Sequence, residues 1–226
     1  MLAKTNRPGF SYGRRALLGA FLTGAVLFSS CGGSGFIYVG TDTDRAYFKV
    51  PGNWTKFNKQ QVLVAIGLDL SPDSQSRFRY LVGYDSDPNP SIDHVANPLN
   101  PPTYPAVLAW VRKLDVIDRQ TFSLTSMRNA FYPVDQWGQD HRAELLSSKD
   151  LALPGGFHGA QIVYDVSNGN YSLDAGNLVL RVAQIGLLDA QTNLFYLFVV
   201  RCVADCYSQN QSLIDQIVNS YIVKEH

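Results

Sequence analysis

Two apolar segments near the C-terminus give the clearest pattern in the chain. Residues 178–188 and 194–202 are apolar at nearly every position and rich in β-branched and aromatic side chains, whereas residues 189–193 between them are small or polar. This pattern is typical of a β-hairpin with a longer loop. Successive side chains of a strand point to opposite faces, so both faces of this hairpin must be covered. We therefore expect it at the centre of a sheet.

Further strands are predicted where apolar and polar positions alternate. They cover 46–50, which Pro51 and Gly52 stop, 77–84, with Phe78, Tyr80, Val82 and Tyr84 on one face, 106–114 and 159–166. A second apolar run covers 61–70, and 144–151 is a further short element.

Helices are predicted late in the chain. Ser123 can cap a helix on which Leu124, Met127 and Phe131 share one face and which Pro133 ends. A closing helix carries the apolar stripe Leu213, Ile214, Ile217, Val218 and Tyr221. Many strands and few βαβ spacings predict the α+β class, an antiparallel β-sheet with helices packed on it in a single domain.

The N-terminal segment has the pattern of an export signal. Lys4, Arg7, Arg14 and Arg15 precede an apolar run over 16–28, and no acidic residue occurs before Asp42. The run has the length of a secretory signal core and is shorter than the roughly 20 apolar residues that a membrane-spanning helix needs. The segment 14–18 also resembles a twin-arginine signal, so export by the general or the twin-arginine route stays open.

The end of this segment resembles the lipobox of bacterial lipoproteins. Ser29 and Ser30 occupy the small positions before Cys31, and Phe28 stands where leucine is usual. The resemblance implies that the Cys31 thiol takes a diacylglyceryl group and that fatty-acyl chains such as palmitate anchor the mature chain. We accordingly predict a signal peptide over 1–30, the lipidated cysteine with a flexible tether over 31–44, and a folded domain over 45–226. The alternative is an ordinary secretory signal.

Removal of the signal changes the charge of the chain. The first 30 residues hold 4 of the 19 basic residues and none of the 19 acidic ones, so the mature chain has 15 basic against 19 acidic residues, a formal charge of −4. Such a domain lacks the basic surface that nucleic-acid binding requires. We expect no nucleic-acid partner.

The segment 85–105 differs in composition from its surroundings, because it is rich in proline, asparagine and aspartate. A long irregular excursion in a compact domain is uncommon and often functional. We predict a binding rim here, with Asp85 and Asp93 in the loop and Tyr104 and Trp110 near its exit. The alternative is a surface insertion without a partner.

The chain offers few residues for chemistry. Cys202 and Cys206 remain once Cys31 is acylated, and they can form a disulfide if the chain turns between them; two free thiols are the alternative. A metal site that adds His141 or His158 does not fit zinc-ligand spacing. Asp140–His141 with Glu144, and Asp93–His94, are candidate acid/base groups or solvated surface pairs. Because no catalytic or cofactor motif occurs, we predict no catalytic residue, metal or cofactor.

The whole pattern resembles the PsbP-like family. The segment 48–54, the paired late strands and the terminal helix that ends in Ser220, Tyr221, Ile222 and Val223 carry this resemblance, which extends to actinobacterial lipoproteins of the LpqN-like kind. It implies an α/β/α sandwich and a role as a binding or assembly accessory rather than an enzyme. We therefore expect a lipoprotein on the outer face of the cytoplasmic membrane with a membrane-proximal partner in the cell envelope. The alternatives are an envelope hydrolase that uses a carboxylate or His141, and a protein that binds lipid or sugar.

Overall fold

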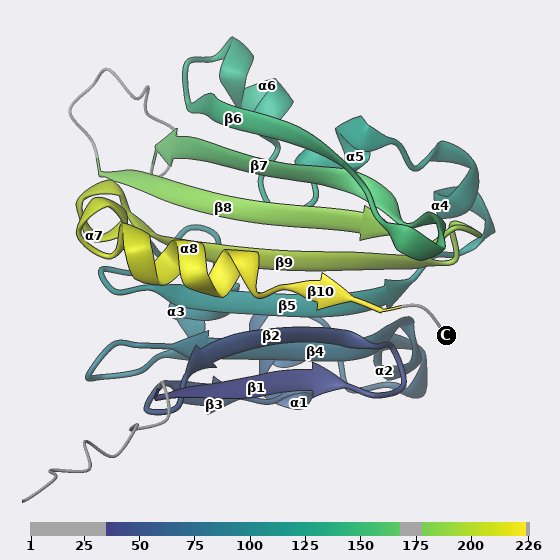
Figure 1. Ribbon diagram of the computed structural model, residues 1–226, viewed down its shortest axis with the longest axis horizontal. Coiled ribbons are helices and arrows are strands. Elements are labelled where there is room, and N and C mark those ends of the chain that lie inside the picture. The colour runs from purple at the N-terminus through teal and green to yellow at the C-terminus, as the bar shows by residue number, and fades with distance from the viewer. Residues whose placement is uncertain (1–34, 168–177, 225–226) are drawn as a thin grey trace, which may run out of the picture. The chain divides into compact units, whose positions relative to one another are not determined.

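A seven-stranded antiparallel sheet forms the middle layer of the protein in the computed structural model, which describes residues 35–167 and 178–224. The strand order is β3-β4-β5-β9-β8-β7-β6. The bounds are β3 (Thr55–Phe57), β4 (Phe78–Asp85), β5 (Ala106–Lys113), β6 (Ala143–Ala152), β7 (His158–Ser167), β8 (Val179–Leu188) and β9 (Leu194–Val203). The apolar hairpin is therefore β8 and β9, and its central position confirms the prediction (Figure 1).

A second, three-stranded sheet and two helices cover one face of the middle layer. The small sheet has the order β1-β2-β10, with bounds β1 (Phe36–Thr41), β2 (Ala46–Pro51) and β10 (Ile222–Val223). The helices are α7 (Ala204–Gln209) and α8 (Gln211–Asn219), and α8 lies along β9 in Figure 1. Phe48 of the small sheet and Tyr221 both pack on Phe198 of β9, at 4.9 and 4.6 Å between ring centroids. One buried cluster thus joins these elements.

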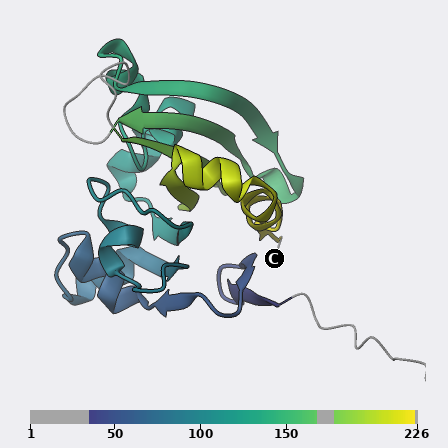
Figure 2. The same ribbon diagram turned by 90° about the vertical axis from the view of Figure 1, so that its left-hand side faces the viewer.

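Short helices cover the opposite face, as the turned view in Figure 2 shows. They are α1 (Lys59–Ala65), α2 (Pro72–Arg77), α3 (Ile92–Ala96), α4 (Val116–Thr121), α5 (Leu124–Arg128) and α6 (Val134–Gln139), and a 3₁₀ helix, η1 (Pro154–Gly156), precedes β7. Five of them begin at a polar cap, Asn58, Ser71, Ser91, Asp115 and Ser123. Helices this short are marginal in isolation, so their packing on the sheet must stabilise them. Their buried side chains join the sheet in a second core cluster.

This arrangement of antiparallel sheets with helices packed on them confirms the α+β class. Cys31 and the predicted signal peptide lie outside the described residues. Among the described residues, no helix is long and apolar enough to cross a bilayer.

Three sequence expectations need correction. Strand β1 lies within the segment predicted as a tether and pairs with β2 along its whole length, so the folded unit begins before residue 45. The helix capped by Ser123 ends at Arg128 rather than at Pro133, because Asn129 already caps it, and Phe131 lies beyond it. Residues Ile222 and Val223 form β10, because they pair with Tyr47 and Ala46 of β2 instead of extending α8.

The predicted shared face of 77–84 is also divided. The pairing of β4 with β5 shifts between Phe78 and Tyr80, and this extra residue reverses the alternation. Phe78 consequently packs on Trp110 toward the helices, whereas Tyr84 packs on Phe48 toward the small sheet. Tyr80 and Val82 stay on the Tyr84 side.

Candidate functional site at the loop between β4 and β5

The segment of residues 86–105, which we call the rim loop, is built around the carboxylate of Asp85. This side chain ends β4 and is only 1% exposed. It accepts hydrogen bonds from the backbone N–H of Asp87 at 3.0 Å and of Ser91 at 2.9 Å, and from Nδ1 of His94 at 2.8 Å. Asp85 therefore fixes the first turn of the rim loop from beneath and is not part of an exposed rim. His94 pairs with Asp85 and not with its neighbour Asp93.

The composition of the rim loop suggested a segment without regular structure, but the loop contains α3. Ser91 caps this helix, and Val95 and Ala96 are buried beneath it. Gly83 of β4 makes room for Val95: a Cβ atom on Gly83 would approach Cγ1 of Val95 to 2.3 Å. The helix thus packs directly on the sheet.

Arg201 of β9 holds the other end of α3. Its guanidinium is 1% exposed and donates to the carbonyl oxygens of His94 at 2.9 Å and Asn97 at 2.7 Å. It also donates to the hydroxyl of Tyr132 at 2.6 Å, and that hydroxyl donates to the carbonyl of Pro98 at 2.7 Å. Carbonyl groups at a helix C-terminus attract a cation. The two terminal nitrogens of the guanidinium make these contacts, whereas its buried Nε has no hydrogen-bond partner among the described residues. The sequence pattern did not single out Arg201, although one charged residue inside an apolar strand is a usable signal.

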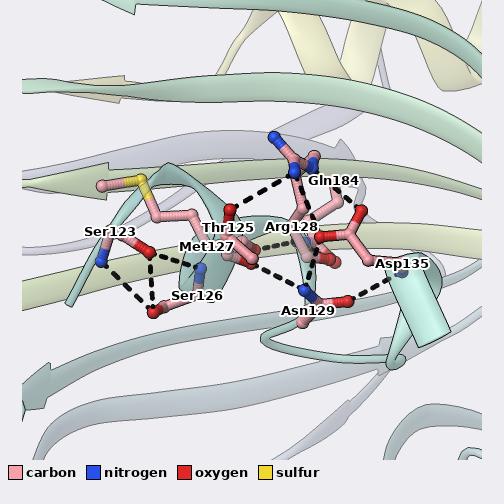
Figure 3. A network of polar contacts seen from close by, with 8 residues as sticks. All are labelled: Ser123, Thr125, Ser126, Met127, Arg128, Asn129, Asp135 and Gln184. Carbon is pink, nitrogen blue, oxygen red and sulfur yellow. Dashed lines mark hydrogen bonds and ion pairs between the residues drawn. The ribbon is translucent and has the colours of Figure 1, made fainter. Parts of the chain in front are cut away.

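Gln184 of β8 plays the same part for α5, as Figure 3 shows. Its amide nitrogen donates to the carbonyl of Met127 at 2.6 Å. Its amide oxygen accepts a hydrogen bond from the hydroxyl of Tyr164 at 2.9 Å. Next to it, the carboxylate of Asp135 accepts two hydrogen bonds from Arg128 and one from Asn129. Gln184 is 1% exposed. A buried polar side chain on each central strand thus fixes one short helix.

Two tyrosines connect these anchor points. The rings of Tyr132 and Tyr164 meet edge to face with centroids 6.2 Å apart. Burial raises the pKa of both phenols, so both stay protonated and act as hydrogen-bond donors at neutral pH. The rim loop and α5 consequently rest on one continuous buried network.

The exit of the rim loop places Tyr104 at the surface. The ring is 45% exposed, and Leu99, earlier in the loop, is 62% exposed. The backbone N–H of Val203 donates to the carbonyl of Pro102 at 2.9 Å, which ties this part of the loop to the end of β9. Tyr104 borders a hollow of about 350 Å³, whose other lining residues are Thr103, Val203, Asp205, Cys206, Gln209 and Asn210. Of the predicted rim residues, Asp93 and Tyr104 are exposed.

Trp110 lies elsewhere. It points from β5 toward the helix layer and packs edge to face on Phe78 at 5.9 Å. It borders a separate hollow of about 310 Å³ together with Arg112, Phe122 and Phe195. Four residues of extended strand, about 13 Å, separate it from the start of β5, so it is not part of the rim.

Cys202 and Cys206 lie at disulfide-bonding distance, with Cα atoms 5.9 Å apart. Cys202 is in β9 and Cys206 in α7, so the chain turns between them as the disulfide prediction requires. Cys206 borders the same hollow as Tyr104.

The histidines proposed for other chemistry are dispersed. His141 occupies an exposed turn after α6 with a φ of 54°, and His158 begins β7. The pairs Ala143–Val166 and Ala152–His158 mark opposite ends of the β6–β7 hairpin, so the two histidines lie at different ends. Within residues 35–167 and 178–224, no group of three His, Cys, Asp or Glu residues could hold a metal ion.

Comparisons with known proteins show likeness in structure only. No protein-family model and no curated protein matches the sequence. Among solved structures, the chain is similar to the cyanobacterial PsbP protein of Synechocystis sp. PCC 6803, with 16% identity, a TM-score of 0.43 and coverage of 87% of this chain and 99% of that one.

Two further structures show similar values. The Ran-binding protein Mog1p of Saccharomyces cerevisiae has 11% identity, a TM-score of 0.43 and coverage of 83% of this chain and 95% of that one. The protein of unknown function PA94 of Pseudomonas aeruginosa has 7% identity, a TM-score of 0.40 and coverage of 84% and 99%. These likenesses concern the fold alone.

Proposed function

We propose that the protein is a bacterial lipoprotein, anchored through Cys31 to the outer face of the cytoplasmic membrane, whose domain binds another protein or component of the envelope through the rim loop. The basic and apolar pattern of residues 4–31 supports the anchor. The construction of the rim loop supports the binding role.

The observation that carries the binding role is the way buried groups hold the rim loop. Asp85 fixes its beginning and Arg201 fixes α3 and the turn after it. A loop that is already ordered loses little conformational entropy when a partner binds. Leu99 and Tyr104 are thus presented in one arrangement, and exposed aromatic side chains on such a surface are typical binding anchors.

The charges beside these anchors indicate the kind of partner. Asp93 lies exposed on α3, and Asp205 borders the same hollow as Tyr104. A partner that combines an apolar patch with lysine or arginine at its margin complements this surface. A membrane-proximal envelope protein with such a patch is the partner that we propose.

Photo-crosslinking in intact cells tests the binding role. A photoreactive residue at Leu99 or Tyr104 is expected to capture a discrete partner, whereas the same residue at Ile117 on α4, which is 74% exposed, serves as the matched control. Tyr104→Ala should abolish capture from a photoreactive residue at position 99, Leu99→Ala should abolish capture from position 104, and neither should change the melting temperature. Equal capture from all three positions excludes the rim loop as the binding surface. Deletion of the whole loop is a poor test, because it strips Asp85 and Arg201 of their partners.

Metabolic labelling with a radioactive fatty acid tests the anchor. Label should enter the wild-type protein and be lost in Cys31→Ala. If both proteins label equally, the N-terminal segment is a plain secretory signal.

A hydrolase is a second candidate, and the pairing of Asp85 with His94 favours it. A carboxylate that accepts from Nδ1 of an imidazole orients the ring in the way that general-base histidines require. His94 is partly exposed, with 20% of its side chain accessible. This candidate predicts ester, peptide or glycan hydrolysis that His94→Gln abolishes and His141→Ala leaves intact; activity unaffected by His94→Gln rejects this site.

Binding of lipid or sugar is a third candidate, because Trp110 and three phenylalanines surround the hollow of about 310 Å³. Mass spectrometry of the protein purified from its native envelope should then find a ligand that Trp110→Ala loses. Absence of any co-purifying molecule in the wild-type protein counts against this function.

A further inference from the structure

The outer face of the small sheet combines tyrosine and lysine side chains. On β2, Ala46, Phe48 and Val50 point into the core, so Tyr47 and Lys49 point outward. The strand pairing places Tyr38 of β1 opposite Lys49 and Ile222 of β10 opposite Tyr47. We call Tyr38, Tyr47, Lys49, Ile222 and Lys224 the tyrosine–lysine face. Among these residues, Tyr38 is 76% exposed and Ile222 is 44% exposed.

Each lysine of this face lies against a tyrosine ring. The Lys49 ammonium lies 4.9 Å from the centroid of Tyr38, and the Lys224 ammonium lies 5.1 Å from that of Tyr47. Tyrosine has an apolar ring and a polar tip, and lysine has an apolar stem and a charged head, so both residue types favour the boundary between water and lipid. The carboxylate of Asp42 accepts a hydrogen bond from the Tyr47 hydroxyl at 3.0 Å.

The anchor lies close to this face along the chain. Four residues lie between Cys31 and Phe36, the first residue of β1, so five Cα–Cα steps join the two. Even fully extended, they reach only about 17 Å. A lipidated Cys31 therefore holds β1 near the lipid head groups. The inner side of β1 and β2 is covered by the core, so the outer side is the one available to the membrane.

Charge favours the same orientation. The mature chain carries a formal charge of −4, which an anionic membrane surface repels as a whole. Lys49 and Lys224 give the tyrosine–lysine face two outward ammonium groups that anionic head groups attract. This distribution of charge favours the orientation in which the tyrosine–lysine face lies toward the lipid.

We infer that the tyrosine–lysine face is a membrane-contact surface, on which the anchored domain lies against anionic phospholipid. The inference rests on the proposed lipid anchor at Cys31. It also leaves the rim loop free to receive a partner, because the contact uses only β1, β2, β10 and the residue after it.

Tryptophan fluorescence in vesicles tests this orientation. The lipidated protein, purified from membranes, is reconstituted in phosphatidylethanolamine–phosphatidylglycerol vesicles with or without acyl chains brominated near the head group, which quench nearby tryptophan. The test variant is Tyr38→Trp. The matched control is Val64→Trp on α1, an exposed apolar position in the opposite outer layer, 59% exposed. The emission of wild-type Trp54, Trp110 and Trp137 is subtracted from both.

The added emission of Tyr38→Trp is expected to be quenched at least twofold more strongly than that of Val64→Trp. Both tryptophan variants are also made with the double substitution Lys49→Glu and Lys224→Glu. This substitution should remove the difference in quenching between Tyr38→Trp and Val64→Trp, while the fatty-acid label on Cys31 remains. Equal quenching in labelled Tyr38→Trp and Val64→Trp overturns the contact surface and leaves the anchor intact. Absence of the fatty-acid label overturns the anchor and the contact surface together.

Discussion

The guanidinium of Arg201 donates a hydrogen bond of 2.6 Å to the hydroxyl of Tyr132, and both side chains are 1% exposed. The two residues are 69 positions apart in sequence. Together they hold the carbonyl groups that follow α3, because Arg201 donates to Asn97 and Tyr132 donates to Pro98. The conformation of the rim loop therefore depends on a contact between β9 and the segment after α5.

Replacing Arg201 should loosen the rim loop. Arg201→Met keeps most of the apolar volume but leaves the carbonyls of His94 and Asn97 without their donor. We expect the free energy of unfolding to fall by about 3 kcal/mol, measured by urea denaturation, and amide exchange in the loop to accelerate. Tyr132→Phe removes the donor to Pro98 and the acceptor of one Arg201 N–H, and it should cost about 2 kcal/mol. A loss below about 1 kcal/mol in Arg201→Met would show that water replaces the guanidinium.

The contact between Gly83 and α3 gives a second prediction. In Gly83→Ala the new Cβ meets Val95 at 2.3 Å, so α3 must shift, and we expect a loss of about 1–3 kcal/mol in thermal or urea unfolding. The control is Gly138→Ala in α6, where the nearest atom lies 3.8 Å away. That substitution should stabilise the protein by about 0.5–1 kcal/mol. Equal stabilities for the two variants would contradict the close packing of α3.

Acid should weaken the attachment of α5. Hydrogen bonds from Arg128 hold the pKa of Asp135 below its usual value. Because the folded-state pKa is lowered, the stabilisation is present above the unfolded-state pKa of about 3.9 and is lost as pH falls through the folded-state value. The pair is partly exposed, so its contribution is about 0.5 kcal/mol. Asp135→Asn should therefore lose less stability than wild type between pH 6 and pH 2.5; identical acid profiles contradict this.

Alkali should act through Tyr207, a buried tyrosine of α7. Burial, followed by the nearby Asp215 carboxylate, raises the pKa of Tyr207 to about 12. Because the raised folded-state pKa lies above the unfolded value of about 10, the stabilisation is complete below pH 10 and is lost as pH rises toward 12. Ultraviolet titration of Tyr207→Phe against wild type should show one phenol fewer ionising near pH 12. If Tyr207→Phe instead lacks a phenol that ionises near pH 10, the Tyr207 hydroxyl is exposed to water.

The cysteine pair gives a last prediction. Joining Cys202 and Cys206 closes a small loop, so reduction or the double substitution Cys202→Ser with Cys206→Ser should cost about 2 kcal/mol. Thermal melts with and without reductant measure the effect. The double variant should show no further change on reduction, which separates loss of the bond from other effects of the reductant.

Much of the fold follows from local pattern. Strands β5, β7, β8 and β9, the closing helix α8 and the Ser123 cap lie close to where apolar periodicity and turn residues predict them. These signals are strong because each depends on neighbouring residues only. The central place of the β8–β9 hairpin also followed, since strands with two apolar faces must be covered on both.

The rim loop shows where local pattern fails. Composition located the segment but not α3, because the helix depends on Asp85, Gly83 and Arg201, which come from strands elsewhere in the chain. Asp85 and Trp110 were both predicted at the binding rim, but Asp85 is buried and Trp110 faces the helices. A bulge such as the one after Phe78 reverses the alternation of side chains along a strand. The position of a residue in the sequence then no longer predicts which face of the sheet its side chain occupies.

The sequence by itself determined the class of fold, the central hairpin, the closing helix and the spacing that lets Cys202 meet Cys206, because periodicity and chain reach are properties of consecutive residues. Only the tertiary structure decided that β1 belongs to the fold, that His94 pairs with Asp85, and that Arg201 and Gln184 hold the short helices. Those contacts join distant segments, and a buried polar group is stable only where the folded chain brings it a partner.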